Sequence, residues 1–334
     1  MDTSVTYAGL ELRGPIVAGA SPLTHDIDTA RRLEEAGAAA IVMHSLFEEQ
    51  IERDELALHY HVEATAHSHP EADSYLPDVG GYRLGPDAYV EQLGRLKRAV
   101  SIPVFGSLNG ISAGGWIRYA AHMEQAGADA IELNLYDVPT DPDESGAEVE
   151  ARYVDTVRAV VDAVSIPVAV KLSPFLSAPV HMAARLADAG AAAIVVFNRF
   201  YQPDIDIEAL DVTPALTLSS PDELRLRLRW LAAMYGRVSA SLAATGGVHS
   251  AAGAIKALMA GASAVQMTSA ILRAGPAAVA AVVAEMLAWL EEHEYESVRQ
   301  MIGSMSLQRC PDPEAFERAN YMQVLQSWKH GGVV

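Results

Sequence analysis

Apolar residues along this chain fall into eight short continuous runs separated by stretches with helical spacing. Continuous apolar runs of this length are typical of strands buried on both faces of a parallel sheet. The intervening stretches, such as 28–36, 115–126 and 148–163, predict amphipathic helices. The predicted strands cover residues 16–21, 40–45, 104–108, 130–135, 168–173, 193–198, 241–246 and 264–269.

A repeated Ala-Gly-Ala tripeptide marks the ends of four predicted helices. Glycine after a helix adopts the left-handed capping conformation without a Cβ clash. Each copy is followed directly by an apolar run, so the repeat predicts a helix, a stop and a buried strand. The copies stand at residues 36–38, 126–128, 189–191 and 260–262.

Eight strands alternating with helices predict an α/β protein with a (β/α)₈ TIM barrel, because barrels of this kind have about 250 residues. We expect a single domain, with the barrel over residues 1–290 and a C-terminal helical extension over 291–334 packed on it. A long loop, 46–86, follows the second strand. A doubly wound sheet is the alternative, but it usually has about five to seven strands.

Composition excludes several classes of function. The formal net charge of −19 disfavours binding to nucleic acid or to anionic membranes. No apolar run is long enough for a membrane span. The single cysteine, Cys310, allows no internal disulfide and is consistent with the cytoplasm. The histidines at 59, 61, 67 and 69 lack the converging ligands of a zinc site, so no metal site is predicted.

The C-terminal ends of the strands meet at one mouth of a barrel, where the active sites of such enzymes lie. Lys171 ends an otherwise buried strand. It is either a rim lysine with its ammonium in water or a fixed positive charge beside a group that becomes anionic. Polar residues end the predicted strands: Ser21, His44, Asn109, Asn134, Lys171, Asn198, Thr245 and Thr268.

Two neighbouring turns predict a phosphate site. Gly246-Gly247 follows the seventh strand and Thr268-Ser269 follows the eighth. The loops after these two strands commonly bind phosphate in barrels, where glycines admit the anion to the backbone and helix N-termini attract it. An ordinary tight turn is the alternative.

An ordered set of short motifs resembles the dihydroorotate dehydrogenase family of FMN-dependent barrels. The resemblance runs from about residue 3 to residue 302. The motifs are Val-Ala-Gly-Ala-Ser-Pro at 17–22, Glu-Leu-Asn-Leu at 132–135, Val-Lys-Leu-Ser-Pro at 170–174, Thr-Gly-Gly-Val at 245–248 and Met-Thr-Ser-Ala at 267–270.

This resemblance implies an FMN-dependent oxidoreductase acting on a CH–CH group, with dihydroorotate as a small-molecule substrate oxidised to orotate in pyrimidine biosynthesis. Lys171 would lie by the N1/O2 edge of the flavin, where it would stabilise negative charge. A homodimer is possible. The implied cofactor-binding residues are Ala20, Ser21, His44, Asn109, Asn134, Lys171, Asn198, Gly246, Gly247, Thr268 and Ser269.

The chain departs from the family pattern at the residue that acts as catalytic base. The family uses a cysteine or serine on a loop, and Asp137 stands where the cysteine would stand; Tyr136 and Ser145 are the other candidates. The predicted catalytic residues are Lys171, Asp137 and Asn134. His44 replaces a lysine that the family usually has near the flavin. Three alternatives remain: the same flavin barrel acting on another small anionic or cyclic compound, a phosphate-binding lyase or isomerase without flavin, and a flavin-binding protein without turnover.

Overall fold

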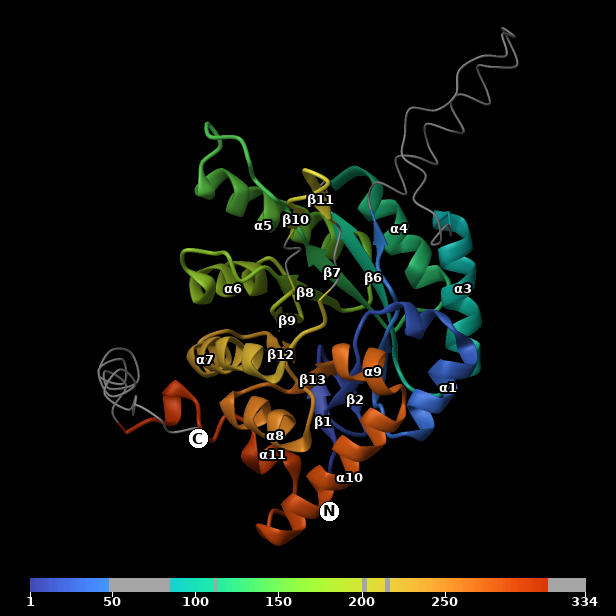
Figure 1. Ribbon diagram of the computed structural model, residues 1–334, viewed down its shortest axis with the longest axis vertical. Helices are drawn as coiled ribbons and strands as arrows, with labels where there is room; N and C mark the ends of the chain where they lie inside the picture. Colours follow the sequence, from blue (N-terminus) through green and yellow to red (C-terminus); the bar gives the residue numbers. More distant parts are fainter. Residues whose placement is uncertain (48–84, 111–112, 200–202, 214–216, 312–334) are drawn as a thin grey trace, which may run out of the picture.

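The computed structural model describes residues 1–47, 85–110, 113–199, 203–213 and 217–311, and its strands form a closed parallel barrel (Figure 1). Neighbouring strands pair in chain order, and β4 closes the ring by pairing with both β3 and β6. The predicted (β/α)₈ barrel is therefore confirmed. The barrel strands are β3 (Ile16–Ala18), β4 (Ala40–Val42), β6 (Val104–Gly110), β7 (Ala130–Leu135), β8 (Val168–Leu172), β9 (Ala193–Val196), β12 (Ser241–Thr245) and β13 (Ala264–Met267).

Six of these strands end one to three residues earlier than predicted, because the polar residues that follow them leave the sheet to form turns at the mouth. β6 instead continues for two residues further, since β5 (Leu46–Phe47) adds to its end through the pairs Leu46–Leu108 and Phe47–Asn109. Residues 48–84 of the predicted long loop, including the histidines at 59–69, lie outside the described residues, and Pro86, its predicted last residue, begins α3.

Helices alternate with the strands and cover the outside of the barrel (Figure 1). The helix before β12 begins with a 3₁₀ turn, Pro221–Glu223, and continues as α7. The helices are α1 (Ile27–Glu35), α3 (Pro86–Ala99), α4 (Ala113–Gln125), α5 (Gly146–Ala163), α6 (Pro179–Asp188), α7 (Leu224–Met234), α8 (Ala251–Ala260), α9 (Ser269–Ala274), α10 (Ala277–Glu292) and α11 (Val298–Met301).

The repeated tripeptides end their helices as predicted. All four central glycines have positive φ values, which an L side chain rarely adopts. The angles are +102° at Gly37, +96° at Gly127, +100° at Gly190 and +128° at Gly261.

A short hairpin closes the barrel floor, where the strands begin. β1 (Val5–Tyr7) pairs with β2 (Leu10–Leu12). The ring of Tyr7 stacks on that of Phe105 with 5.8 Å between centroids, and the Ala8 N–H donates to Ser241 Oγ at 3.3 Å. The hairpin blocks this end and leaves the opposite mouth for a site. Across the described residues, no helix combines the length and apolarity that a membrane span requires.

Candidate active site

The sheet register brings three predicted site residues together at the mouth. Asn109 on β6 is paired with Asn134 on β7, which is paired with Lys171 on β8. Side chains alternate between the two faces of a strand, so paired residues share a face. Glu132 is paired with Ala169 and lies on the same face as Asn134, two residues nearer the floor.

Lys171 points its ammonium into the protein. Its side chain is only 9% exposed, and Nζ donates to Glu132 Oε1 at 2.6 Å. Glu132 itself is completely buried. A rim lysine would hold its ammonium in water, so that alternative is wrong. The structure instead supplies a fixed positive charge at the end of β8.

Glu132 connects Lys171 to the opposite side of the barrel. Its second oxygen accepts a hydrogen bond from Gln266 Nε2 on β13. Tyr7 lies on the floor side of this group, and burial, together with the charge of Glu132, raises the pKa of its hydroxyl well above the ordinary value. The sequence interpretation missed Glu132 and Gln266. The available signal was a polar residue within an otherwise apolar strand.

Two buried polar atoms at the mouth have no hydrogen-bond partner among the described residues. They are Ser21 Oγ, in a residue 5% exposed, and Asn134 Oδ1, in a residue 3% exposed. Leaving a buried polar group unpaired costs about 1–3 kcal/mol, so native proteins seldom do so. Both atoms are therefore suited to bind a polar molecule that enters the mouth.

His44 follows β4 and supplies a neutral imidazole to the site. Its ring makes edge contacts with His25 and Tyr89, each with 5.0 Å between centroids. Burial, and secondly the charge of His25, lower the pKa of His44 to about 4. A histidine with such a pKa is uncharged at neutral pH. It cannot replace the positive charge of a lysine at this position.

One buried serine joins the two turns predicted to bind phosphate. The Ser219 N–H donates to Ser269 Oγ at 3.0 Å, and Ser219 Oγ accepts from the Gly247 N–H at 3.2 Å. His249 Nε2 lies 3.3 Å from the same hydroxyl. A single residue touches both turns, so the turns are close enough to share one ligand.

Gly247 allows the chain to turn tightly against α7. A Cβ atom added at Gly247 would lie 2.4 Å from the backbone nitrogen of Leu224, and φ at Gly247 is +81°. We therefore expect Gly247→Ala to lower the free energy of unfolding by about 1–2 kcal/mol through φ and by about 1–3 kcal/mol more through the clash. Chemical denaturation measures the change.

Gly9→Ala is the matched control for this prediction. Gly9 lies in the floor hairpin with a φ of +76°, and no described atom lies within 4 Å of its Cβ position. Gly9→Ala should lower the free energy of unfolding through φ alone, by about 1–2 kcal/mol. Equal losses in the two variants would contradict a steric role for the turn.

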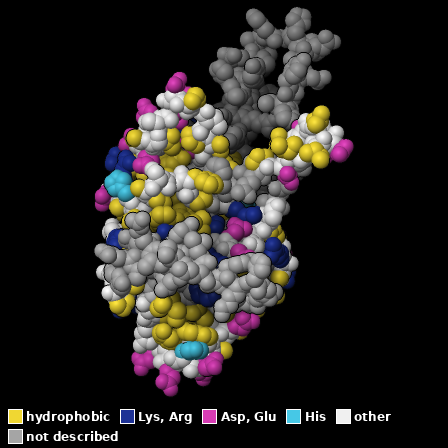
Figure 2. Space-filling view, turned by 60° about the vertical axis from the view of Figure 1, so that its left-hand side comes forward, with side chains coloured by type: hydrophobic (Ala, Val, Ile, Leu, Met, Phe, Trp, Pro, Cys, Tyr) yellow, Lys and Arg dark blue, Asp and Glu magenta, His cyan; other side chains and the backbone are white. Residues whose placement is uncertain are grey.

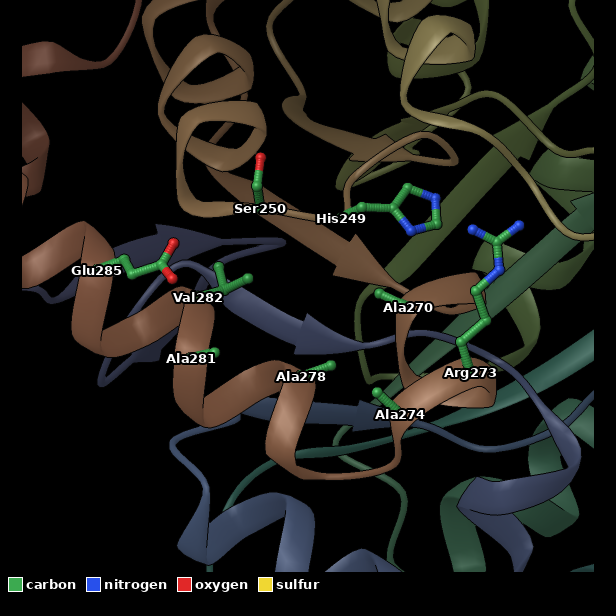
Figure 3. Close-up of a pocket in the computed structure, with 9 residues that line it drawn as sticks. All are labelled: His249, Ser250, Ala270, Arg273, Ala274, Ala278, Ala281, Val282 and Glu285. Atoms are coloured by element: carbon green, nitrogen blue, oxygen red, sulfur yellow. The ribbon is translucent and has the colours of Figure 1, made fainter.

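A cavity of about 320 Å³ lies beside these turns, outside the barrel, between α8, α9 and α10 (Figure 3). His249 contributes an imidazole and Arg273 a guanidinium group to its lining, and Glu285 lies at the far end of the cavity. Burial, and secondly the charge of Arg273, lower the pKa of His249. Ser250 caps α8, as its side chain accepts from the Gly253 N–H at 3.2 Å.

Asp137 is held by an ion pair on the loop after β7. Its side chain is 8% exposed, and Oδ2 accepts from Arg152 Nη2 at 2.6 Å. Arg152, on α5, also pairs with Glu144. Hydrogen bonds to Glu144 and Asp137 raise the pKa of Arg152. Ser145, another candidate base, caps α5 in a reciprocal arrangement with Glu148.

The remaining predicted residues lie at the same mouth. Ala20 and Asn198 are half-buried in the segments after β3 and β9, and the Asn198 N–H donates to the Leu172 carbonyl at 2.7 Å. Thr268 precedes α9, and its hydroxyl lies 2.4 Å from the position that a Cβ atom on Gly19 would take. Ligand contacts for these residues stay a prediction.

Comparison with known proteins gives matches along most of the chain. A family model described as dihydroorotate dehydrogenase matches residues 68–290, more than half of the sequence. A Thermoplasma acidophilum protein named dihydroorotate dehydrogenase B (NAD(+)), catalytic subunit, is 29% identical over 316 residues, covering 90% of this chain and 98% of the relative. Proteins of the same name from Geobacter sp. strain M21 and Methanothermobacter thermautotrophicus are both 28% identical, covering 92% and 91% of this chain and 99% and 97% of their own lengths.

Proposed function

Because the chain belongs to the dihydroorotate dehydrogenase family, we propose that this flavin-dependent oxidoreductase uses FMN to convert dihydroorotate to orotate. The observation that carries the proposal is that a buried ammonium, that of Lys171, and two buried polar atoms without a described partner, Ser21 Oγ and Asn134 Oδ1, lie at the same mouth. The proposal is also supported by the relatives, which are named dihydroorotate dehydrogenases.

The residues at the mouth fit FMN. The turns at Gly246-Gly247 and Thr268-Ser269, tied together by Ser219, would hold the phosphate through backbone N–H groups. Ser21 Oγ and Asn134 Oδ1 would contact the ring, since both are buried without another described partner. Ala20, His44, Asn109 and Asn198 would complete the contacts.

When bound, FMN supplies a hydride acceptor for a CH–CH bond. Lys171 would stabilise negative charge on the ring. Asn134 would orient the substrate. Asp137 would accept the neighbouring proton on its carboxylate, with Arg152 holding that carboxylate in place through Oδ2.

Gentle purification and anaerobic titration test this proposal. The purified chain should carry flavin absorbance, and dihydroorotate added without oxygen should bleach it. Bound flavin that dihydroorotate does not bleach would favour the alternative of another small anionic or cyclic substrate. The neutral His44 favours an uncharged cyclic compound within this alternative, because it brings no positive charge to an anion such as dihydroorotate. A chain without flavin would favour a phosphate-binding lyase or isomerase.

We also propose that the chain assembles with other subunits. The hairpin β10 (Asp204–Asp206) and β11 (Asp211–Thr213) has four exposed apolar side chains, with Ile205, Ile207, Leu210 and Val212 between 55% and 86% exposed. Exposed hydrophobic groups recur over one face of the molecule (Figure 2). Clustered apolar side chains in water are typical of an interface. The relatives are named catalytic subunits, which supports a partner subunit. The proposal of a homodimer rests on the exposed hairpin alone.

Charged substitutions on the hairpin should weaken a homodimer. We expect the double variant Ile205→Asp, Leu210→Asp to raise the dimer dissociation constant by at least about ten-fold, because two apolar contacts become charged. Light scattering across a concentration series measures this constant. Met305→Asp is the control, since Met305 is 68% exposed and lies outside the hairpin. Equal effects of both changes would contradict an interface at the hairpin.

A further inference from the structure

A completely buried carboxylate lies below the mouth of the barrel. Glu132 is 0% exposed and stands on the inward face of β7, two residues nearer the floor than Asn134. The proposed reaction assigns it no step. Burying a carboxylate costs free energy unless it is paired, and barrel interiors are usually filled by branched apolar side chains. Its presence therefore needs a reason beyond packing.

The partners of Glu132 place its charge directly against that of Lys171. Oε1 accepts from Lys171 Nζ at 2.6 Å, while Oε2 accepts from Gln266. Glu132 and Lys171 come from neighbouring strands and Gln266 from another side of the barrel. The carboxylate is thus fixed through both oxygens, and the ammonium is fixed through the carboxylate.

Stability alone does not account for this pair. Replacing a buried ion pair with well-packed apolar residues is often neutral or stabilising, because desolvation offsets the attraction between the charges. The pair does change the electrostatics of the mouth. Alone, the ammonium would contribute a full positive charge; together with Glu132 it contributes a short dipole, which attracts an anion much less.

We propose that Glu132 is a positioning residue that fixes the Lys171 ammonium and offsets its charge, and so holds the reduction potential of bound FMN at a lower value. The inference rests on the proposed function, because it concerns the flavin at this site. FMN gains negative charge near N1 when it is reduced. Removing the charge of Glu132 would leave Lys171 uncompensated and would favour the reduced form.

Glu132→Gln tests the charge at constant shape. The new side chain can accept from Lys171 through its oxygen and donate from its amide to Gln266, whose own amide can turn to accept. At a fixed potential we expect the ratio of reduced to oxidised FMN to rise at least ten-fold, which equals a positive shift of about 30 mV for two electrons. Titration against redox dyes, without substrate, measures the midpoint potential.

Three further variants separate charge from structure. Glu132→Ala also removes the charge and should shift the potential in the same direction, which provides a second measurement should Glu132→Gln fold poorly. Glu132→Asp keeps the charge and should change the ratio by less than about three-fold. Gln266→Leu breaks the other hydrogen bond of Glu132 without changing any charge, and it should lower the melting temperature but leave the potential unchanged.

Each outcome decides the inference. Neutral variants of Glu132 that lose stability while keeping the wild-type potential would show a structural residue only and would overturn the proposal, as would a negative shift. Wild-type protein that binds flavin and oxidises dihydroorotate while the potential is insensitive to Glu132 would leave the proposed function standing without this inference. Wild-type protein that binds no flavin would remove both.

Discussion

Replacing Lys171 with methionine is expected to slow substrate oxidation by about 10²–10³-fold and to lower the free energy of unfolding by about 3–5 kcal/mol. The kinetic loss follows from removing a fixed positive charge from the place where negative charge develops. The loss of stability has a different cause. Methionine leaves Glu132 buried without a cation, and the carboxylate is 0% exposed.

The double variant Lys171→Met, Glu132→Gln separates these two effects. With both charges gone, no unpaired charge is buried, so most of the lost stability should return. The rate should recover only in part, because the unpaired negative charge of Glu132 is gone but the ammonium is still absent. Stopped-flow measurement of anaerobic flavin bleaching gives the rate, and chemical denaturation gives the stability. A double variant that regains the full wild-type rate would contradict a direct role for the Lys171 ammonium.

Replacing Asp137 with asparagine should slow flavin bleaching by dihydroorotate by about 10²–10⁴-fold, the usual contribution of a positioned general base. The amide keeps the size of the carboxylate and can still accept from Arg152, so substrate affinity and fold should change little. It cannot accept the substrate proton at neutral pH. The same stopped-flow assay, with substrate concentration varied, separates the rate of bleaching from binding.

Glu144→Gln is the matched control, because Glu144 pairs with the same arginine, Arg152, and has no proposed part in proton transfer. It should change the rate by less than a few-fold, because Glu144 has no proposed contact with the substrate and its ion pair with Arg152 is partly exposed. Similar rates in Asp137→Asn and Glu144→Gln would show that Asp137 anchors the loop through its ion pair and does not accept the substrate proton. The proton acceptor would then be sought elsewhere on the mouth, with Tyr136 the remaining candidate of those predicted.

Local patterns in the sequence were sufficient to predict the barrel. Apolar runs specify strands buried on both faces, and the Ala-Gly-Ala repeats specify where four helices end, because each depends on residues close in the chain. The strand ends also identify the mouth, since parallel strands in a closed ring share one direction. The positions of Lys171, Asn134 and the glycine turns at strand ends are therefore enough to predict them as site residues.

Contacts between distant strands could not be predicted in this way. Glu132 and Gln266 are 134 residues apart in the sequence, and their hydrogen bond depends on the closure and register of the barrel. The same holds for Ser219, which joins two turns from different strands. A polar residue within an apolar strand marks Glu132 and Gln266 as unusual, but the local pattern does not show which distant residues they contact.

The sequence by itself determined which segments become strands and helices and which polar groups reach the mouth, because periodicity and capping are properties of neighbouring residues. Only the tertiary structure decided how those groups are charged and held. It buried the Lys171 ammonium against Glu132, paired Asp137 with Arg152 and made His44 neutral. Burial and through-space charge depend on atoms that the fold, rather than the order of residues, brings together.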